Sequence, residues 1–464
     1  MAFSGLAEKN SFKKSVLSIE ERIVEGKALR DATPLASHGG WKAHRNRRDP
    51  IKILIEQNKT RIPSLVPIRF GRMMQSPFTF LRGSAAVMAA DLADTPISGI
   101  RVQACGDCHL VNFGVFATPE RNLIFDINDF DETLPAPWEW DLKRLATSFV
   151  VAGRNNGLPE KESLSAVREL VRTYRTRMGE FARMRTLDVW YTKLELETFL
   201  RDTGDSKWVK KMRGKVKKAR KSVADIFPAM TTLKDGKVVI KDEPPLIFHL
   251  GDPTEKKAEQ IILGVLGRYR ETLPESHRVL LDNFRFIDIA NKVVGIGSVG
   301  MSCYVVLFMA SADDPLFLQL KQVNASVLEP YAGRSKYKHH GQRVVMGQRL
   351  MQSASDIFLG WTTGRNKSRH FFVRQLRDWK IKPVVESFNG PRLFRYAQAT
   401  GLTLARAHAR SGKAPEIRGY LGKKDVFDSA IVKFAKDYAD QTERDHAAFV
   451  KAVRSRRIEA IMQD

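Results

Sequence analysis

Residues 105–112 are the first group whose side chains and spacing are suited to chemistry. They contain a Cys-x-x-Cys-His run, which alone is typical of covalent haem attachment, and its Cys-x-x-Cys part is typical of a redox dithiol. The same stretch places Asp107 five residues before Asn112. This spacing suits phosphoryl transfer, in which the aspartate accepts a hydroxyl proton and the asparagine binds Mg²⁺.

The surrounding sequence disfavours haem and dithiol chemistry. Residues 1–31 have no apolar run after their lysines, so we expect no signal peptide and no export. No thioredoxin-type βαβ unit is readable around Cys105 and Cys108, and three cysteines in 464 residues fit a reducing compartment. We therefore expect a cytoplasmic protein without haem, although Cys105, Cys108 and His109 match its pattern, and we interpret the cysteines as frame residues.

A second group lies far downstream, in a glycine-rich stretch. Gly295, Gly297 and Gly300 form a G-x-G-x-x-G match that also contains Ser298. A dinucleotide fold would need a helix directly afterwards, whereas β-type sequence continues here. A glycine turn between two strands is instead the arrangement that covers ATP phosphates, and Lys321 on the following strand would contact them. The alternative is an edge-strand lysine that points into solvent.

Other charged residues complete this set. Asp129 follows a short β-turn-β segment and is placed to be a second metal ligand. Glu329 is the nearest acidic candidate to pair with Lys321. Arg82 suits either a phosphate contact or a structural salt bridge, of which we favour the salt bridge. We interpret His408 as a packing histidine rather than a ligand.

The elements that must position these residues indicate an α+β fold. We expect an N-terminal helical segment at 1–96, helix-rich sequence with short strands at 97–280, a β-rich lobe at 281–385, and amphipathic helices at 386–464. Within the second part, a basic helical insertion is expected at about 200–235. The longest apolar stretches are too short to span a membrane.

The net charge of +25, from 77 Lys and Arg against 52 Asp and Glu, favours anionic partners. Residues 206–222 hold nine Lys or Arg and no acid. The simplest interpretation is a solvated helix face, and a surface that contacts phosphate or nucleic acid is the alternative.

Three motifs together resemble the aminoglycoside phosphotransferase and choline kinase branch of the protein-kinase-like superfamily. They are GDCHLVNF, INDFDE and PAPWEWDLKRLATS, similar to the branch patterns H-G-D-x-H-x-x-N, I-D-[FW] and D-P-x-x-D-L-A. The resemblance implies that Asp107 is the catalytic base and that Asn112 and Asp129 bind Mg²⁺.

The same resemblance assigns supporting residues. His109 matches the motif histidine, and Asp141 matches an aspartate that braces the catalytic loop from the next helix. Cys105 stands where the pattern has its first histidine, which is a departure.

The chain is also identified as a member of a bacterial family known as domain of unknown function 2252. Its long matching stretches include LVPIRFGRMMQSPFTFLRGSAAVMAADLA, NDFDETLPAPWEWDLKRLA, KQVNASVLEPY and GQRLMQSASDIFLGWT. Membership of this family implies no particular activity.

The order of the motifs predicts a circularly permuted, two-lobed kinase-like fold with additional helices, because Asp107 precedes the glycine turn. The tail stretch LTLARAHARSG resembles the helix that leads into a catalytic loop. We expect ATP- and Mg²⁺-dependent phosphoryl transfer to a hydroxyl of a small molecule, and the basic surface suits an anionic acceptor. The alternatives are a nucleotide-binding pseudokinase, a transferase that moves AMP, and a polyanion binder that uses residues 206–222, for which nucleic acid is a less favoured partner.

Overall fold

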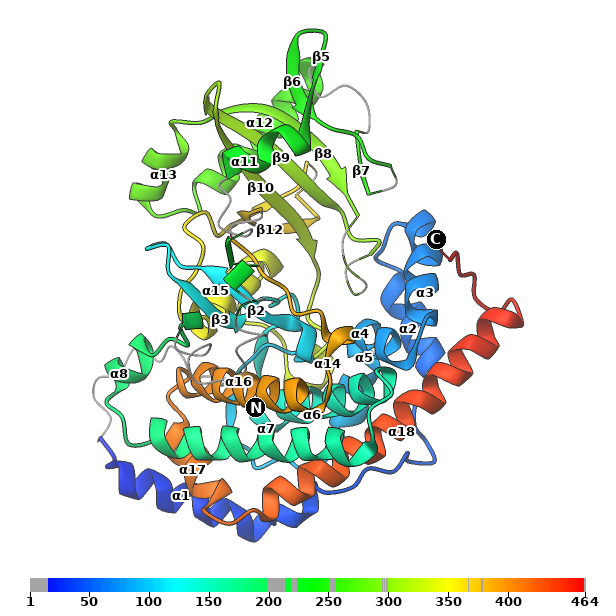
Figure 1. The fold of residues 1–464 in the computed structure, drawn as a ribbon, viewed down its shortest axis with the longest axis vertical. Helices are drawn as coiled ribbons and strands as arrows, with labels where there is room; N and C mark the ends of the chain where they lie inside the picture. Colours follow the sequence, from blue (N-terminus) through cyan, green and yellow to red (C-terminus); the bar gives the residue numbers. More distant parts are fainter. Residues whose placement is uncertain are drawn as a thin grey trace.

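The computed structural model has a lobe built on a sheet above a mostly helical lobe (Figure 1). Helices and strands are both well represented, so the predicted α+β class is confirmed. The structure describes residues 16–197, 210, 213–214, 216–217, 223–244, 246–249, 256–293, 295, 297, 299–365, 367–376 and 379–462. Within these ranges, no helix is both long enough and apolar enough to cross a membrane.

The upper lobe is organised around a six-stranded antiparallel sheet with the spatial order β11-β12-β10-β9-β8-β7. Five of its six strands, β8 to β12, lie within the β-rich segment predicted at 281–385. The six strands are β7 (Ile247–Phe248), β8 (Arg285–Lys292), β9 (Cys303–Ser311), β10 (Asp314–Val323), β11 (Gly360–Thr363) and β12 (His370–Gln375).

Both faces of this sheet are covered, which explains why every residue of β10 after Asp314 is buried. Alternate side chains of β9 and β10 enter two different apolar clusters. One cluster contains residues of α12 (Lys256–Arg270) and α13 (Glu275–Leu281), and the other contains residues of α11 (Val223–Met230) and of the hairpin β5–β6 (Thr231–Lys234, Lys237–Ile240). Residues from 227 onwards thus pack against the sheet and belong to its lobe, although the predicted boundary of this lobe is at 281.

The lower lobe is a helical assembly that carries two small hairpins on its upper side. β1 (Arg101–Ala104) pairs with β4 (Leu134–Pro137), and β2 (Phe113–Ala117) pairs with β3 (Leu123–Ile127). Every residue of α6 from Trp138 to Gly153 is buried, since neighbouring helices surround it. The helices are α6 (Trp138–Asn155), α7 (Glu160–Phe181), α8 (Thr186–Tyr191), α16 (Gly390–Ala409), α17 (Ala414–Leu421) and α18 (Val426–Arg454).

Five N-terminal helices complete the lower lobe. The first packs against α17, and the second to fourth pack against α18. The fourth and fifth helices are separate because Ser84, which lies between them, leaves the helical region with φ −115° and ψ 35°. The five helices are α1 (Ile19–Ala32), α2 (Pro50–Asn58), α3 (Val66–Met74), α4 (Pro77–Gly83) and α5 (Ala85–Leu92).

Two shorter elements, α14 (Glu329–Ala332) and α15 (His340–Met351), join the lobes between β10 and β11. The buried Arg343 of α15 donates to the carbonyl groups of Asp131 and Thr133 in the lower lobe, both at 2.7 Å. It also donates to the Asn324 carbonyl at 2.9 Å. A single guanidinium group therefore ties the end of β10 to the loop that follows β3.

A buried ion pair joins the second hairpin to the C-terminal helices. Arg406 of α16 donates to the Asp126 carboxylate of β3 at 2.5 Å, and both side chains are almost fully buried. The other oxygen of Asp126 accepts the backbone N–H and the hydroxyl of Ser353, at 2.9 and 2.8 Å. A buried charge is tolerated only when it is paired and hydrogen-bonded, so the two residues depend on each other.

We predict that Asp126→Ala lowers the free energy of unfolding by about 3 to 5 kcal/mol, because it leaves the Arg406 guanidinium buried without a partner. Combining Asp126→Leu with Arg406→Met removes both charges and should restore most of that loss. Chemical denaturation of the three proteins measures both effects. A single variant as stable as the wild type would contradict this account of the pair.

Candidate active site

The loop between β1 and β2 holds the central candidate residues, and Asp141 in the first turn of α6 fixes its shape. The backbone N–H groups of Cys105 and Gly106 donate to the Asp141 carboxylate at 2.7 and 2.9 Å. Gly106 has a φ of +82°, and a Cβ there would collide with the Glu132 carbonyl. The loop therefore needs glycine at 106 and an acceptor at 141.

His408 of α16 lies behind Asp141. Its Nε2 is 3.2 Å from the Asp141 carboxylate, and its Nδ1 is 2.9 Å from the hydroxyl of Tyr174. All three side chains are buried. Both ring nitrogens thus have partners within the protein, as expected of a packing histidine.

Asp107 itself is partly accessible to solvent, with 22% of its side chain exposed. Arg144 donates from Nε to Asp107 Oδ1 at 2.7 Å, and its Nη2 donates to the Leu81 carbonyl at 2.9 Å. The second oxygen, Oδ2, lies 3.9 Å from His109 Nε2. One oxygen of Asp107 is thereby held by a buried guanidinium group, and the other is left for a ligand.

His109 is buried directly after this loop. Burial lowers its pKa to about 4, since the opposing charge of Asp107 does not offset the loss of solvent. The imidazole is therefore neutral at neutral pH and serves Asp107 as a polar neighbour without positive charge.

Asn112 and Asp129 are brought together by backbone contacts. The side-chain amide of Asn112 donates to the Asp107 backbone carbonyl at 2.7 Å, and the backbone carbonyl of Asn112 accepts the N–H of Asn128 at 2.7 Å. Burial alone would raise the pKa of Asp129, but the positive charges of Lys321 and Arg374 outweigh it and lower that pKa. An ionised carboxylate and an amide oxygen thus flank the loop, and these are ligand types that suit Mg²⁺.

Lys321 of β10 reaches this group from the upper lobe. Its side chain is 6% exposed, and its ammonium group forms an ion pair with the Asp131 carboxylate. Burial opposes its charge, yet Asp129 and Asp131 raise its pKa, so it remains protonated. Lys321 is thus a buried residue that joins the two lobes and not an edge-strand lysine in solvent.

The predicted acidic partner of Lys321 needs correction. Glu329 accepts the N–H of Ser326 at 3.4 Å at the start of α14, and its charge acts on Arg343. Asp131 pairs with Lys321 instead, because the loop after β3 lies directly below β10 while residue 329 has already turned away with α14.

The glycine turn lies between β8 and β9, and residues of the N-terminal segment donate hydrogen bonds to its carbonyl groups. Gly295 and Gly300 have φ of +66° and +88°. Arg72 donates to the Gly295 carbonyl at 2.6 Å, Arg61 donates to that of Val299 at 2.5 Å, and the Gly300 carbonyl accepts the N–H of residue 62 at 2.8 Å.

The rest of the turn is only partly described. Gly297 lies against α4, since a Cβ there would be 3.6 Å from the Arg82 carbonyl. The predicted residue Ser298 lies outside the described residues. The glycine turn is thus placed over the end of α4, on the same side of the molecule as Asp107.

Arg82 lies in the last turn of α4. The sequence favoured a structural salt bridge for it, but Arg82 forms no salt bridge with any residue in the described ranges. Burial lowers its pKa, and the charges of Glu386 and Asp107 oppose this effect. Arg82 therefore stands in the electric field of the candidate base without a direct partner there.

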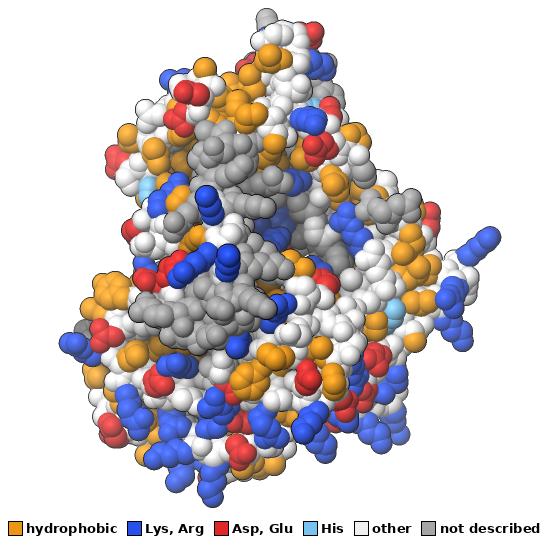
Figure 2. All heavy atoms as spheres, viewed as in Figure 1, with side chains coloured by type: hydrophobic (Ala, Val, Ile, Leu, Met, Phe, Trp, Pro, Cys, Tyr) orange, Lys and Arg blue, Asp and Glu red, His pale blue; other side chains and the backbone are white. Residues whose placement is uncertain are grey.

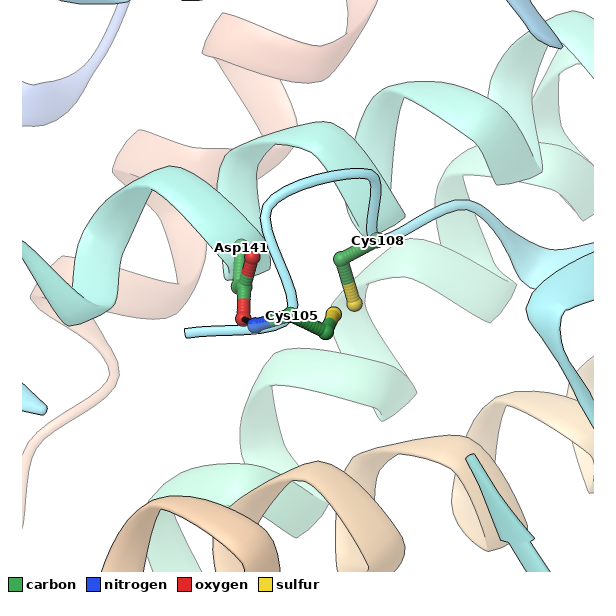
Figure 3. Close-up of side chains that lie close together, drawn as sticks. All are labelled: Cys105, Cys108 and Asp141. Atoms are coloured by element: carbon green, nitrogen blue, oxygen red, sulfur yellow. Dashed lines mark hydrogen bonds between the residues drawn. The ribbon is translucent and has the colours of Figure 1, made fainter. Parts of the chain in front are cut away.

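Cys105 and Cys108 turn their thiol groups toward one another beneath the loop, next to Asp141 (Figure 3). One ligand atom from each of the three residues lies within 4.8 Å of the others. Burial raises the pKa of both thiols, that of Cys108 to about 11, so thiolates are disfavoured. Since the Asp141 oxygens already accept backbone N–H groups, the cluster is suited to supporting the loop and poorly suited to holding a metal.

The basic stretch 206–222 lies largely outside the described residues. Of its nine cations, only Lys210, Arg213 and Lys217 are described, and Arg213 lies 3.6 Å from the Glu197 carboxylate on the surface. Its predicted contact with phosphate or nucleic acid stays a prediction.

Several residues of the site were not predicted. Arg144 stands three residues after Asp141 on one helix face, so its position near the loop was open to inference. Asp131 belongs to the acid-rich stretch that also holds Asp129. Arg61 and Arg72 had no local signal, because their contacts with the glycine turn join distant parts of the chain.

The chain belongs to the DUF2252 family, described as uncharacterized protein conserved in bacteria, whose model matches residues 61–452. This range includes the loop between β1 and β2, the glycine turn and Lys321. No curated protein and no solved structure is similar enough to the chain to count as a match.

Glu132 adds a titrating group close to the loop. Its carboxylate accepts the N–H of Val327 at 2.7 Å, and its carbonyl accepts the Ser326 hydroxyl at 2.7 Å. Burial raises its pKa to about 7; Arg343 and the Val327 N–H oppose the shift, and the charges of Asp107 and Asp131 add to it. Since the usual value is 4.5, the folded protein holds this proton where the unfolded chain has lost it.

We predict that Glu132 makes the folded state less stable as the pH rises. Its contribution is full below about pH 4.5 and is lost as the pH passes through about 7. Glu132→Gln cannot titrate, so the wild type should lose up to about 3 kcal/mol relative to this variant between pH 5 and 8. The free energy of unfolding is measured for both proteins at each pH by denaturant titration, and the difference between them removes the effect of all other titrating groups. A difference that does not change with pH would contradict the prediction.

Proposed function

We propose that the protein transfers a phosphoryl group from ATP to a hydroxyl of a small molecule, in a kinase-like fold with circularly permuted lobes. The observation that carries the proposal is the meeting of Lys321 from the sheet lobe with the acidic loop that contains Asp129 and Asp131. Asp107 and Asn112 lie on the neighbouring loop. Phosphoryl transfer needs this combination of a positioned base, oxygen ligands and a cation from the opposite lobe.

In this mechanism Asp107 accepts the proton of the acceptor hydroxyl through Oδ2, while Arg144 keeps Oδ1 in place. The hydroxyl oxygen forms a bond to the γ-phosphorus, the bond between that phosphorus and the bridging oxygen breaks, and ADP leaves with the electron pair. His109, neutral and buried, adds no positive charge that would weaken the base.

Asn112 and Asp129 would hold Mg²⁺, which when bound would neutralise charge on the phosphates. The residues fit this ion. The Nδ2 group of Asn112 is committed to the Asp107 carbonyl, so its amide oxygen is the atom left to bind a metal, and Lys321 and Arg374 keep Asp129 ionised. Lys321 would move from Asp131 toward the phosphates, while the glycine turn offers backbone N–H groups above them.

The packing of the C-terminal helices supports the permuted order. The Ser411 hydroxyl, just after α16, accepts the N–H of Gln103 at 2.9 Å, and His408 contacts Asp141. The end of α16 thus lies against the strand that enters the catalytic loop. In an unpermuted kinase that helix would lead into the loop through the chain itself, and permutation is tolerated when the joined ends lie close together.

One observation favours a second candidate, a nucleotide-binding protein without transfer activity. Arg144 holds Asp107 by a charge-assisted hydrogen bond, and a carboxylate engaged in this way can serve to hold the loop in place instead of accepting a proton. Nucleotide binding without any release or transfer of phosphate would select this candidate.

The first test is thermal unfolding with Mg²⁺ alone, ATP alone and both together. We expect a rise in Tm that needs both, because a ligand that binds only the folded state stabilises it, and we expect Asp129→Ala to abolish this rise. Asp94→Ala, an exposed carboxylate in the N-terminal segment, is the matched control and should keep it. No rise at saturating ligand would refute nucleotide binding at this site.

The second test separates transfer from binding. Asp107→Asn should lower the release of phosphate from ATP, with water as the acceptor, by about 100-fold or more while it leaves the Tm rise nearly intact, since the base acts on the acceptor and not on the nucleotide. Phosphate release is measured at saturating Mg²⁺ and ATP. Turnover equal to that of the wild type would remove Asp107 from its proposed role.

A further inference from the structure

Two basic side chains near the acidic loops have no counter-charge at contact distance: Arg82 lies within the field of Asp107, and Lys382 lies within that of Asp129. Among the described residues, Arg82 and Lys382 donate no hydrogen bond and form no ion pair. Arg144 and Lys321, which also face the acidic loops, are both paired with carboxylates. Arg374, a further cation there, donates hydrogen bonds to the Gln319 side chain and the Asn128 carbonyl. The two unpaired residues therefore differ in kind from the cations that hold the site together.

Arg82 lies in the last turn of α4, which also accepts a hydrogen bond from Arg144 and so lies beside Asp107. The carbonyl of Leu81, its neighbour in the chain, accepts the hydrogen bond from Arg144, which in turn binds Asp107. The guanidinium group lies 5.8 Å from the centre of the Phe78 ring, and its Nε is buried without a hydrogen-bond partner in the described part of the chain. A stacked, half-buried guanidinium group with free donors is prepared for an acceptor.

Lys382 reaches the site through an antiparallel bridge. Ile381 and Val115 exchange backbone hydrogen bonds of 2.8 and 3.0 Å, which places Lys382 alongside Gly114 at the end of the catalytic loop. The Lys382 side chain is accessible to solvent, while burial by the surrounding protein and the charge of Arg374 lower its pKa. This combination is expected for a lysine on the wall of a cleft.

Arg82 and Lys382 lie close enough for their charges to interact. The charge of Arg82 contributes to the lowered pKa of Lys382, and Asp129 opposes that effect. Figure 2 shows that the face is hollowed between the two lobes and that Lys and Arg side chains line the hollow. A half-buried cation that is repelled by a second cation costs free energy, and an anion that binds both would offset this cost.

We propose that Arg82 and Lys382 form a binding site for a phosphate-type oxyanion beside Asp107. A tetrahedral oxyanion accepts a paired hydrogen bond from the guanidinium fork and a further one from the ammonium group. This site rests on the proposed function only for the source of the anion. The source is either the γ-phosphate of the nucleotide or an anionic group of the acceptor.

The probe is inorganic phosphate, which tests the site without nucleotide. Phosphate replaces chloride at constant ionic strength, and thermal unfolding is measured for the wild type, Arg82→Gln and Lys382→Gln. We expect phosphate to raise the Tm of the wild type and this rise to be lost in both variants, which corresponds to an increase in Kd of about tenfold or more. Lys424→Gln, which removes one exposed charge near α18, should keep the rise.

A second arm distinguishes the two sources. The titration is repeated with saturating Mg²⁺ and a non-hydrolysable ATP analogue. Loss of phosphate binding assigns the site to the γ-phosphate, and retained binding assigns it to an anionic acceptor; both results support the site. The phosphate titration is carried out without nucleotide, so its result does not depend on whether Mg²⁺ and ATP bind. A negative result would therefore reject the phosphate site without deciding the proposed function.

The proposal is overturned if phosphate does not stabilise the wild type, if both variants respond as the wild type does, or if Lys424→Gln loses the effect equally. Unfolding midpoints in chloride show whether each variant is folded. If Arg82→Gln does not fold, Lys382→Gln carries the test, because its accessible side chain has no partner within the described residues.

Discussion

The Asp141 carboxylate is the point on which the arrangement of the site depends. It accepts two consecutive backbone N–H groups of the loop between β1 and β2, and His408 and Tyr174 extend this contact into the core of the lower lobe. Two backbone donors in a buried turn need an acceptor, and a single carboxylate provides both of its oxygens. Asp107 occupies its position because this turn cannot relax without losing both hydrogen bonds.

Charge pairing extends this arrangement from one lobe to the other. Arg144 on α6 fixes Asp107 within the lower lobe, and Lys321 pairs with Asp131 across the lobes. Arg343 then ties the carbonyl groups of the same acidic loop to the end of β10. The distance between the lobes is therefore set by buried cations, whose pairing tolerates little displacement.

Sequence reasoning reached the parts of the site that local patterns encode. The Asp-x-x-x-x-Asn spacing located the loop, and the flanking β-type sequence placed the glycine turn between two strands, where β8 and β9 are found. It also gave the mixed helix and strand class. It assigned Glu329 to Lys321 because proximity along the chain was the only guide, whereas Asp131 pairs with it through a contact between lobes. It set the start of the sheet lobe at residue 281, which is too far along the chain. Apolar residues of α11 and α12, which precede the β-type sequence, pack against the sheet and belong to the same lobe.

The long-range contacts of the lower lobe have a consequence for synthesis on the ribosome. Arg406 and His408 are separated from their partners Asp126 and Asp141 by 280 and 267 residues. The sheet strands, by contrast, all lie between residues 247 and 375. During vectorial synthesis the sheet lobe can thus assemble first, while the loop that carries Asp107 waits for the last helices to emerge. Nascent chains would pass through a state in which one lobe is complete and the loop between β1 and β2 has not yet been shaped.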